Sequence, residues 1–221
     1  MRVVAVRALR LDAARGAVAA EVVWNGAWRS AAASGLPNPQ AHPHVRAWRE
    51  AMKAAGAPHK DFPSSIEALL RRALKGGEPF RINPLVDFYN SVSLRNVSPA
   101  GGFDVDALTE GLELRLSRPG DRFAALDGSP SVELPAGEVS YASGVTVLTR
   151  HLLWRQSRHA LVSAATHDAL FLAEIPAALG DELGRAMQAD LERGLREDFG
   201  GEVEARWLDA ERPDWQTAGG R

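Results

Sequence analysis

Four polar residues near the middle of the chain have types and spacing that could position a substrate or a water molecule. Asn83, Asp87 and Asn90 are separated by four and three residues, so they would share one face of a helix that begins before Pro84. Alternatively, Asn83 caps a helix that begins at Pro84. Arg81 could reach a phosphate or a substrate carbonyl, or it could form a surface ion pair with Asp87 or Glu78, which would contribute little stability.

Two further positions could supply backbone donors and a carboxylate. Gly101 and Gly102 permit close approach of the backbone and could offer main-chain N–H groups to an oxyanion or a nucleoside. A plain turn would explain these glycines equally well. Glu138 follows Gly137 at the entrance of a predicted strand, where it could hold an α-ammonium group or orient a water molecule. It could also be a solvated glutamate in a turn.

A third group combines arginines with an aromatic side chain. Arg150, Trp154, Arg155 and Arg158 follow one another closely in the sequence. This mixture is typical of sites that hold single-stranded nucleotides by ring stacking and phosphate pairing. Trp154 could equally be a core residue, so the pattern by itself leaves both interpretations open.

The composition narrows the possible chemistry. The chain has no cysteine, which excludes thiol nucleophiles, disulfides, thiolate zinc sites and iron–sulfur clusters. Its six histidines include no HExxH motif and no compact ligand set, so no metal is expected, and no motif indicates another cofactor. Because the formal net charge is −2, a polynucleotide would have to bind at a localised basic patch.

The same composition predicts a cytoplasmic protein with a full hydrophobic core. The chain has 221 residues, of which 45% are hydrophobic, and this suits one large domain or two small, closely packed lobes. It contains no run of about eighteen apolar residues, and its first ten residues lack the apolar centre of a signal peptide. A membrane is therefore not expected as a partner.

The elements that must position these residues alternate between helices and strands. Residues 2–9 and 17–24 are rich in valine and predict an N-terminal hairpin, and the three prolines of residues 35–44 predict a loop that leads into a helix over about 44–55. Ser64 and Glu67 have capping-box spacing before a helix that stops at Gly76 and Gly77.

The second half of the chain predicts mostly short strands, followed by one long helix. Strands are expected at residues 112–116, 145–154 and 169–175. Apolar residues recur every four positions over about 176–199, which predicts an amphipathic helix, and a strand-like segment follows it. The predicted fold class is α+β, with mixed β-sheets and flanking helices. We expect a single unit over residues 1–210 and a flexible tail over 211–221.

Two blocks of sequence resemble a known family. The stretch PFRINPLVDFYNSVSLRNVSPAGGFDVDAL is similar to the signature of the tRNA-editing domain of the phenylalanyl-tRNA synthetase β subunit. The stretch PAGEVSYASGVTVLTRHLLWRQSRHALVSAATHDALFLAE, which follows an LDG turn, resembles the back half of that domain in freestanding B3/B4-type proteins. The resemblance is strongest over about residues 60–175, and it covers none of the other modules of the synthetase.

The resemblance implies a pocket between two sublobes that accepts the aminoacylated 3′ end of tRNA and hydrolyses a wrongly attached amino acid. The ester is already activated, so a placed water and donors for the oxyanion can suffice. On this hypothesis the candidate catalytic residues are Asn83, Asn90, Gly101, Gly102 and Glu138. The candidate substrate- or tRNA-binding residues are Arg81, Asp87, Arg150, Trp154 and Arg155. The resemblance implies neither a metal nor an organic cofactor, and DNA is not an expected partner.

One departure from the family pattern keeps two alternatives open. Synthetases often have a histidine shortly before the Phe-Asp pair, whereas here Gly101 and Gly102 precede Phe103 and Asp104. The chain could therefore be a noncatalytic module that binds tRNA or protein, or a hydrolase of a small aminoacyl ester. The sequence does not indicate which amino acid or tRNA is recognised, or the oligomeric state.

Overall fold

The central sheet of the protein, sheet A, joins strands from both ends of the chain. The computed structural model describes residues 1–57 and 60–216. Sheet A is antiparallel throughout, in the order β11 (Glu202–Leu208), β1 (Arg2–Leu9), β10 (Ala169–Ile175) and β2 (Gly101–Asp104). Because side chains alternate along a strand, β1 directs Val4 and Val6 into one hydrophobic core and Val3 and Ala5 into another.

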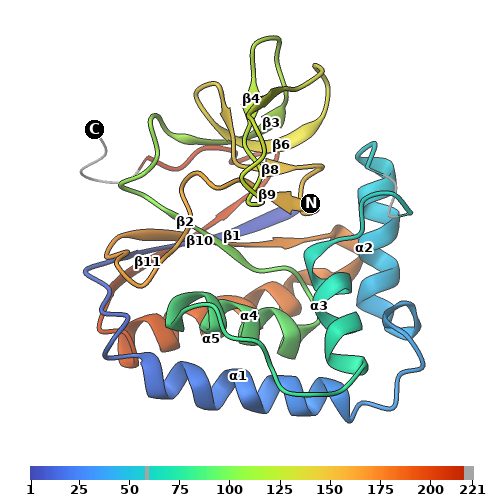
Figure 1. Cartoon of the computed structure of the whole chain (residues 1–221), viewed down its shortest axis with the longest axis vertical. Coiled ribbons are helices and arrows are strands. Elements are labelled where there is room, and N and C mark those ends of the chain that lie inside the picture. The colour runs from blue at the N-terminus through green and yellow to red at the C-terminus, as the bar shows by residue number, and fades with distance from the viewer. Residues whose placement is uncertain (58–59, 217–221) are drawn as a thin grey trace.

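Three helices lie on one side of sheet A; the last two pack against the sheet, and the first packs against the second, farther from the sheet (Figure 1). They are α1 (Ala17–Ala32), α4 (Pro84–Asn96) and α5 (Gly180–Glu197), the last preceded by a 3-10 turn at Ala177–Leu179. Two glycines of α5 bring this layer together. A Cβ atom at Gly194 would overlap the ring of Phe88 on α4, and one at Gly184 would overlap the ring of Trp207 on β11. Any side chain at these two positions would push the layers apart.

A second sheet, sheet B, which has five short strands, lies over the opposite face of sheet A (Figure 1). Its order is β3 (Leu112–Leu116), β6 (Val139–Ser143), β7 (Thr146–Val147), β4 (Arg122–Phe123) and β5 (Val132–Glu133). A separate two-stranded hairpin, β8 (Thr149–Arg150) and β9 (Arg155–Gln156), follows β7. Leu148 and Leu152 from this region are buried in the core between the layers.

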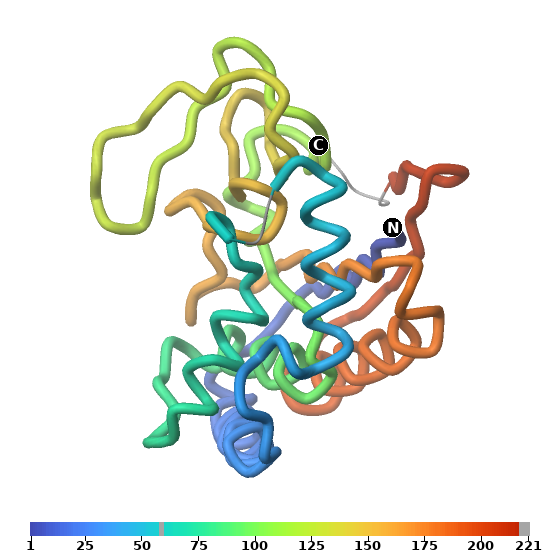
Figure 2. The backbone as a smooth tube through the Cα atoms, turned by 90° about the vertical axis from the view of Figure 1, so that its right-hand side faces the viewer, coloured from blue at the N-terminus to red at the C-terminus, as the bar shows by residue number. Residues whose placement is uncertain are grey.

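Two more helices, α2 (Pro43–Ala54) and α3 (Ser65–Leu74), form one side of the molecule, where α1 is seen end-on (Figure 2). A 3-10 turn at Pro39–Ala41 precedes α2. The side chain of Ser64 accepts the main-chain N–H of Glu67, which confirms the predicted capping box. Trp48 from α2 and Ile66 from α3 are fully buried, so both helices are anchored in the core.

The structure is α+β with mixed sheets and flanking helices, as the sequence predicts. The strands at residues 2–9, 112–116 and 169–175, the helices starting near residues 44 and 64, and the long helix before the last strand are confirmed. Among the described residues, no helix is long and apolar enough to cross a bilayer.

The predicted N-terminal hairpin is wrong. Residues 17–24 form the first half of α1, and β1 instead pairs with β10 and β11, far away in the sequence. The valines that indicated a strand, Val18 and Val22, are 76% and 63% exposed, whereas Trp24, Trp28 and small residues at helical spacing fill the buried face. The helical periodicity therefore outweighs the strand preference of valine.

The predicted strand over residues 145–154 is too long. It breaks into β7 and β8, and a tight turn follows in which His151 and Leu152 have φ values of 45° and 64°. Of the predicted tail, the described part contains Trp215, which packs partly buried against the core between the layers, and residues 217–221 lie outside the described residues. The division into one unit and a tail stays a prediction.

Candidate functional site

Asn83 holds the start of α4 in place. Its side-chain oxygen accepts the main-chain N–H of Val86 at 3.0 Å, which is the geometry of a helix N-cap. Its side-chain NH₂ group donates to the carbonyl of Val162 at 3.1 Å. The helix begins at Pro84, so the capping interpretation of Asn83 is confirmed. The amide also ties α4 to the segment after β9.

The carboxylate of Asp87 is buried beneath the same helix end. The guanidinium of Arg81 donates to it at 2.6 Å and the main-chain N–H of Ile82 donates to it at 3.0 Å. Arg81 is therefore ion-paired with Asp87, as expected, but the carboxylate is buried, so the pair is not the expected surface pair. Arg81 also lies 3.3 Å from Glu21 on α1. The bond to Asp87 raises the pKa of Arg81, and the guanidinium stays charged. Asn90, three residues after Asp87, is half-buried, and within the described chain its side chain makes no hydrogen bond.

Gly101 and Gly102 are strand residues of β2, and the plain-turn interpretation does not hold. A Cβ atom at Gly102 would lie 3.0 Å from the Phe171 ring and 3.2 Å from Val162, whereas one at Gly101 would meet nothing within 4 Å. The main-chain N–H of Asp104 points away from β10, to the carbonyl of Ala160. Because hydrogen-bonding directions alternate along a strand, the N–H of Gly102 points to the same side of β2. On that side Phe103 forms an antiparallel bridge with Leu161 and Gly102 is buried, so residues 160–162 lie along this edge.

The outer edge of β2 carries a residue that sequence reasoning missed. The side-chain amide of Gln156, on β9, donates to the carbonyl of Gly102 at 3.4 Å. Gln156 follows Arg155 directly, and nothing in the local sequence distinguishes it from other surface glutamines. The close packing of Val162 and Phe171 on Gly102 is equally invisible in the sequence, because these contacts join segments far apart in the chain.

Glu138, directly before β6 of sheet B, forms an ion pair with Arg150 of the β8–β9 hairpin. The Glu138 side chain is only 4% exposed and accepts N–H groups of Arg150 at 2.6, 3.0 and 3.2 Å and the main-chain N–H of His151 at 2.9 Å. Burial favours a higher pKa for Glu138, but these bonds outweigh it and hold the pKa below its ordinary value. The interpretation of Glu138 as a solvated turn residue is therefore wrong.

The turn between β8 and β9 is strained, and several contacts fix it. His151 and Leu152 both adopt left-handed backbone conformations, which cost free energy for residues other than glycine. The ring of His151 stacks on Phe62 at 3.5 Å, and burial lowers the pKa of His151. The carbonyl of Leu153 accepts the main-chain N–H of Ser65 at the start of α3. Strained residues of this kind gather at functional sites.

Trp154 lies at the tip of this hairpin and is half-buried. Its ring packs edge-on against Phe62, with centroids 4.9 Å apart, and the guanidiniums of Arg155 and Arg150 lie 5.3 and 5.8 Å from its centre. Arg155 itself is 52% exposed and lies 3.7 Å from Asp127. The aromatic and cationic groups expected to hold a nucleotide are thus together, and the ring contributes to both the core and the surface.

Residues 155–162 join the two groups of candidates. At one end, Arg155 and Gln156 belong to the hairpin that carries Arg150 and Trp154. At the other end, Val162 accepts the Asn83 amide and covers Gly102. The structure therefore places the α4 end and the β2 edge at the C-terminal end of this segment and the Glu138–Arg150 pair near its N-terminal end. Asn83 and Glu138 share no hydrogen bond.

A buried polar pair links sheet B to sheet A. The hydroxyl of Tyr141 on β6 donates to Glu174 on β10 at 2.6 Å, and both residues are buried. The second carboxyl oxygen of Glu174 has no hydrogen-bond partner among the described residues. Burial raises the pKa of Glu174, so folding favours its neutral, protonated form.

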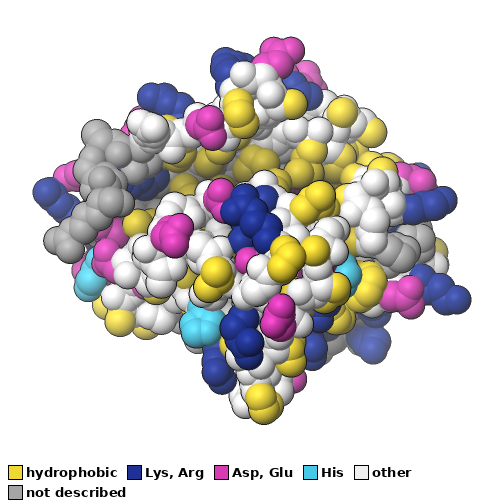
Figure 3. Space-filling model, turned by 90° about the horizontal axis from the view of Figure 1, so that it is seen from above, with side chains coloured by type: hydrophobic (Ala, Val, Ile, Leu, Met, Phe, Trp, Pro, Cys, Tyr) yellow, Lys and Arg dark blue, Asp and Glu magenta, His cyan; other side chains and the backbone are white. Residues whose placement is uncertain are grey.

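Seen from above, the molecule has a hollow lined by hydrophobic side chains (Figure 3). Sheet B, at this end of the molecule, exposes Leu114, Leu116 and Val145. Residues 1–57 and 60–216 contain no group of three or more histidine or carboxylate side chains arranged to hold a metal ion. The candidate residues themselves supply amide and guanidinium donors, those of Asn83, Gln156 and Arg155.

Comparison with known proteins gives the family. No curated protein matches the chain. An N-terminal fragment of the phenylalanyl-tRNA synthetase β-subunit from Pyrococcus horikoshii is a similar solved structure, with 12% sequence identity and a TM-score of 0.41, over 56% of this chain and 43% of that one. The chain thus spans less than half of that fragment. The sequence model of the B3/4 domain matches residues 47–189, which is more than half of the chain and includes every candidate site residue. The chain therefore belongs to the B3/4 domain family.

Proposed function

We propose that this protein is a trans-editing hydrolase, which removes a wrongly attached amino acid from a tRNA. The observation that carries the proposal is the B3/4 family match over residues 47–189. Within that range lie both blocks that resemble the editing domain of phenylalanyl-tRNA synthetase. The substrate on this proposal is an aminoacyl ester at the 3′ end of the tRNA, and the products are the free amino acid and the uncharged tRNA.

The geometry around β2 supports hydrolysis by a placed water. The reaction needs hydrogen-bond donors where the ester carbonyl becomes an oxyanion, and main-chain N–H groups are well suited because they are already oriented. The side-chain amide of Gln156 lies at the outer edge of β2 and supplies such a donor; the N–H of Gly102 points to the same edge but is buried beside the bridge between Phe103 and Leu161. Asn90, whose side chain has no hydrogen bond within the described residues, is available to orient the water.

The β8–β9 hairpin supports binding of the tRNA end. Trp154 offers a partly exposed ring, and Arg155 offers an exposed guanidinium next to it. Stacking of a base on such a ring contributes about 1–3 kcal/mol per base. In this proposal the Glu138–Arg150 pair has a positioning role, because its hydrogen bonds fix the turn that carries Trp154.

A second candidate function is a noncatalytic module that binds tRNA or protein. One specific observation favours it: Asn83 and Glu138, two of the expected catalytic residues, have their polar atoms engaged in structural bonds. On this alternative the protein keeps the fold and binds through the β8–β9 hairpin, but it does not hydrolyse the ester.

A deacylation screen separates the two functions. Each tRNA, charged in turn with its own and with near-cognate amino acids, is incubated with the protein and with variants Asn90→Ala and Trp154→Ala. Asn25→Ala is the matched control, because Asn25 is also a half-buried helical asparagine but lies outside the family match. We expect turnover on at least one mischarged tRNA, loss of rate in Asn90→Ala and a higher KM in Trp154→Ala. Stoichiometric binding without turnover on the whole panel would select the noncatalytic module.

The same screen tests hydrolysis of a small aminoacyl ester. Amino-acid methyl esters replace the charged tRNA under identical conditions. Equal kcat/KM on the methyl ester and on the charged tRNA would contradict the proposal, because it would show that the RNA contributes nothing to recognition.

A further inference from the structure

The basic residues of this protein are unevenly distributed. Residues 25–80 contain eight of the 26 Lys and Arg residues but only four of the 28 Asp and Glu residues. This segment therefore carries a formal charge of +4 in a chain whose net charge is −2. It forms the end of α1 and the helices α2 and α3, which together make the side of the molecule seen in Figure 2. The excess of cations thus belongs to one face.

At the centre of this face, one buried carboxylate holds two guanidiniums. Glu67 on α3 is 1% exposed and accepts N–H groups of Arg49 at 2.7 and 2.9 Å, of Arg71 at 2.7 Å and of Gln40 at 2.8 Å. Burial favours a higher pKa for Glu67, but the hydrogen bonds from Arg49 and Gln40 and the charges of Arg49 and Arg71 together outweigh it, and the carboxyl stays ionised. The cluster keeps a net charge of +1.

Both arginines of this cluster present part of their side chain to solvent. Arg49 is 24% exposed and Arg71 is 43% exposed. Because the carboxylate fixes the two guanidiniums beside each other, little conformational entropy remains to be lost when an anion binds them. A planar guanidinium suits the oxygens of a phosphate group.

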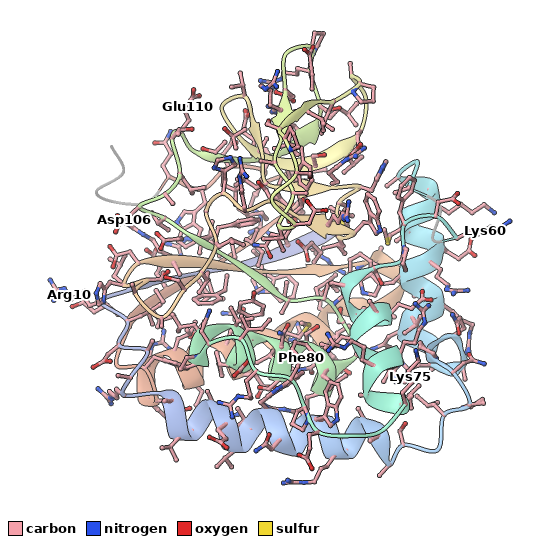
Figure 4. All side chains as sticks on the ribbon, in the orientation of Figure 1. Arg10, Lys60, Lys75, Phe80, Asp106 and Glu110 are labelled. Atoms are coloured by element: carbon pink, nitrogen blue, oxygen red, sulfur yellow. The ribbon has the colours of Figure 1, made fainter. Side chains whose placement is uncertain are left out.

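Other cations continue the surface along both helices. On α2, Arg46 and Lys53 are spaced three and four residues from Arg49 and share its face. On α3, Arg72 and Lys75 occupy the last turn, and Arg72 lies 3.9 Å from the centre of the Phe80 ring. Figure 4 labels Lys75 and Phe80 at this end of α3.

These flanking cations lack acidic partners. Within residues 1–57 and 60–216, none of the four forms an ion pair, although Arg46 donates to the main-chain carbonyls of residues 40 and 41. By contrast, most arginines of α5 and β11 are paired with neighbouring carboxylates. Glu50, Asp61 and Glu78 are the exposed acids of the segment. The charge of this face is therefore not neutralised within the protein.

We propose that the α2–α3 face, defined by Arg46, Arg49, Lys53, Arg71, Arg72 and Lys75, binds the phosphodiester backbone of the tRNA. The choice of RNA as partner rests on the proposed function, whereas the position of the surface rests on the charges alone. The B3/4 site holds the 3′ end, and this face contacts phosphates elsewhere along the same molecule. The contacts are independent of base sequence because they involve only the backbone.

The test measures how the binding of a fluorescently labelled tRNA transcript depends on salt concentration. The transcript carries no amino acid. Anisotropy titrations from 50 to 300 mM KCl compare the protein with the triple variant Lys53→Gln/Arg72→Gln/Lys75→Gln. The matched control is Arg185→Gln/Arg193→Gln/Arg206→Gln, which removes three exposed arginines from α5 and β11. Each phosphate contact adds about 0.9 to the slope of log K against log salt concentration. We expect the α2–α3 triple variant to flatten this slope by about 2 to 3, and the control to leave it unchanged.

Three results would overturn the inference: an unchanged slope in the α2–α3 triple variant, equal changes of slope in both triple variants, or tRNA binding by the unmodified protein that does not respond to salt. Deacylation, measured separately, keeps this test apart from the proposed function. A flattened slope in a protein without turnover supports the surface and contradicts the hydrolase. Turnover with an unchanged slope in the α2–α3 variant supports the hydrolase and contradicts the surface.

Discussion

The pair formed by Glu138 and Arg150 allows a quantitative prediction for the variant Glu138→Gln. The substitution preserves the shape of the side chain but removes its charge, so Arg150 loses the carboxylate to which it donates at 2.6, 3.0 and 3.2 Å. Breaking a fully buried pair costs about 3–5 kcal/mol. Because the Arg150 side chain is 23% exposed, water recovers part of this loss, and we expect a decrease of about 2–3 kcal/mol in the free energy of unfolding.

The double variant Glu138→Leu/Arg150→Met tests whether the loss comes from the uncompensated charge. It replaces both partners by apolar side chains of similar size, which is often neutral for a buried pair. We therefore expect it to be more stable than Glu138→Gln. Urea unfolding followed by tryptophan fluorescence is a suitable assay, because Trp154 lies beside Arg150. The reasoning is refuted if Glu138→Gln costs less than about 0.5 kcal/mol, as surface substitutions do, or if the double variant is the less stable one.

The pH dependence of the same variant provides an independent check. The pKa of Glu138 is lower in the folded protein than its ordinary value, so its contribution to stability is present above the unfolded pKa of about 4.3. This contribution is lost as the pH falls through the folded pKa. The stability difference between the protein and Glu138→Gln should therefore be constant from pH 7 to 8, where His151, which lies 3.4 Å from Glu138 and has a lowered pKa, is neutral in the folded protein, and it should shrink below about pH 4. A difference that grows on acidification would contradict the assignment of the ionised pair.

Three further predictions follow from glycine packing and from the buried carboxyl. Gly102→Ala should lower the free energy of unfolding by about 1–3 kcal/mol, and also the deacylation rate, because the added Cβ meets two side chains. Gly101→Ala should change neither quantity, because its Cβ meets nothing within 4 Å. Urea unfolding and single-turnover deacylation measure the two effects. The pKa of Glu174 is raised in the folded protein, so its contribution to stability is full below about pH 4.3 and is lost as the pH rises through the folded pKa. Glu174→Gln removes this ionisation, so the variant should unfold at a higher urea concentration than the unmodified protein at pH 8 but not at pH 4. Gly184→Ala should destabilise α5 by overlap with an indole ring, and Gly26→Ala, in open space on α1, should stabilise by about 0.5–1 kcal/mol; opposite shifts in Tm test the pair.

The parts of the fold that depend on neighbouring residues could be predicted from the sequence. Ser64 and Glu67 cap a helix within one turn of chain, and Pro84 after Asn83 sets the start of α4 by local backbone geometry. The strand at Ala169–Ile175 is apolar at every position except Glu174, because both of its faces are covered, and its length of seven residues favours a strand. In each of these cases the signal and the structure share the same short segment.

The parts of the fold that depend on contacts between distant segments could not be predicted from the sequence. Residues 17–24 satisfy both a strand and a helix pattern, and only the position of Trp24 against Phe80 and the other core residues decides for the helix. In the site, the sequence identifies Glu138 and Arg150 as polar candidates but does not show that they bind each other. The partners of Gly102 come from β9, β10 and the segment between them, so its role requires the assembled sheet.

The pairing of β1 has a consequence for synthesis on the ribosome. Leu9 of β1 pairs with Glu202 of β11, and Arg2 pairs with Ile175 of β10, so both neighbours of the first strand are translated long after it. At about 5–20 residues per second, β1 waits roughly 10 to 40 s before its second partner exists. During that time the apolar run of Val3 to Val6 stays available to chaperones and to unpaired strands of other nascent chains. Sheet A can therefore close only late in translation, and nascent chains stalled before β10 should be held by chaperones without acquiring protease resistance.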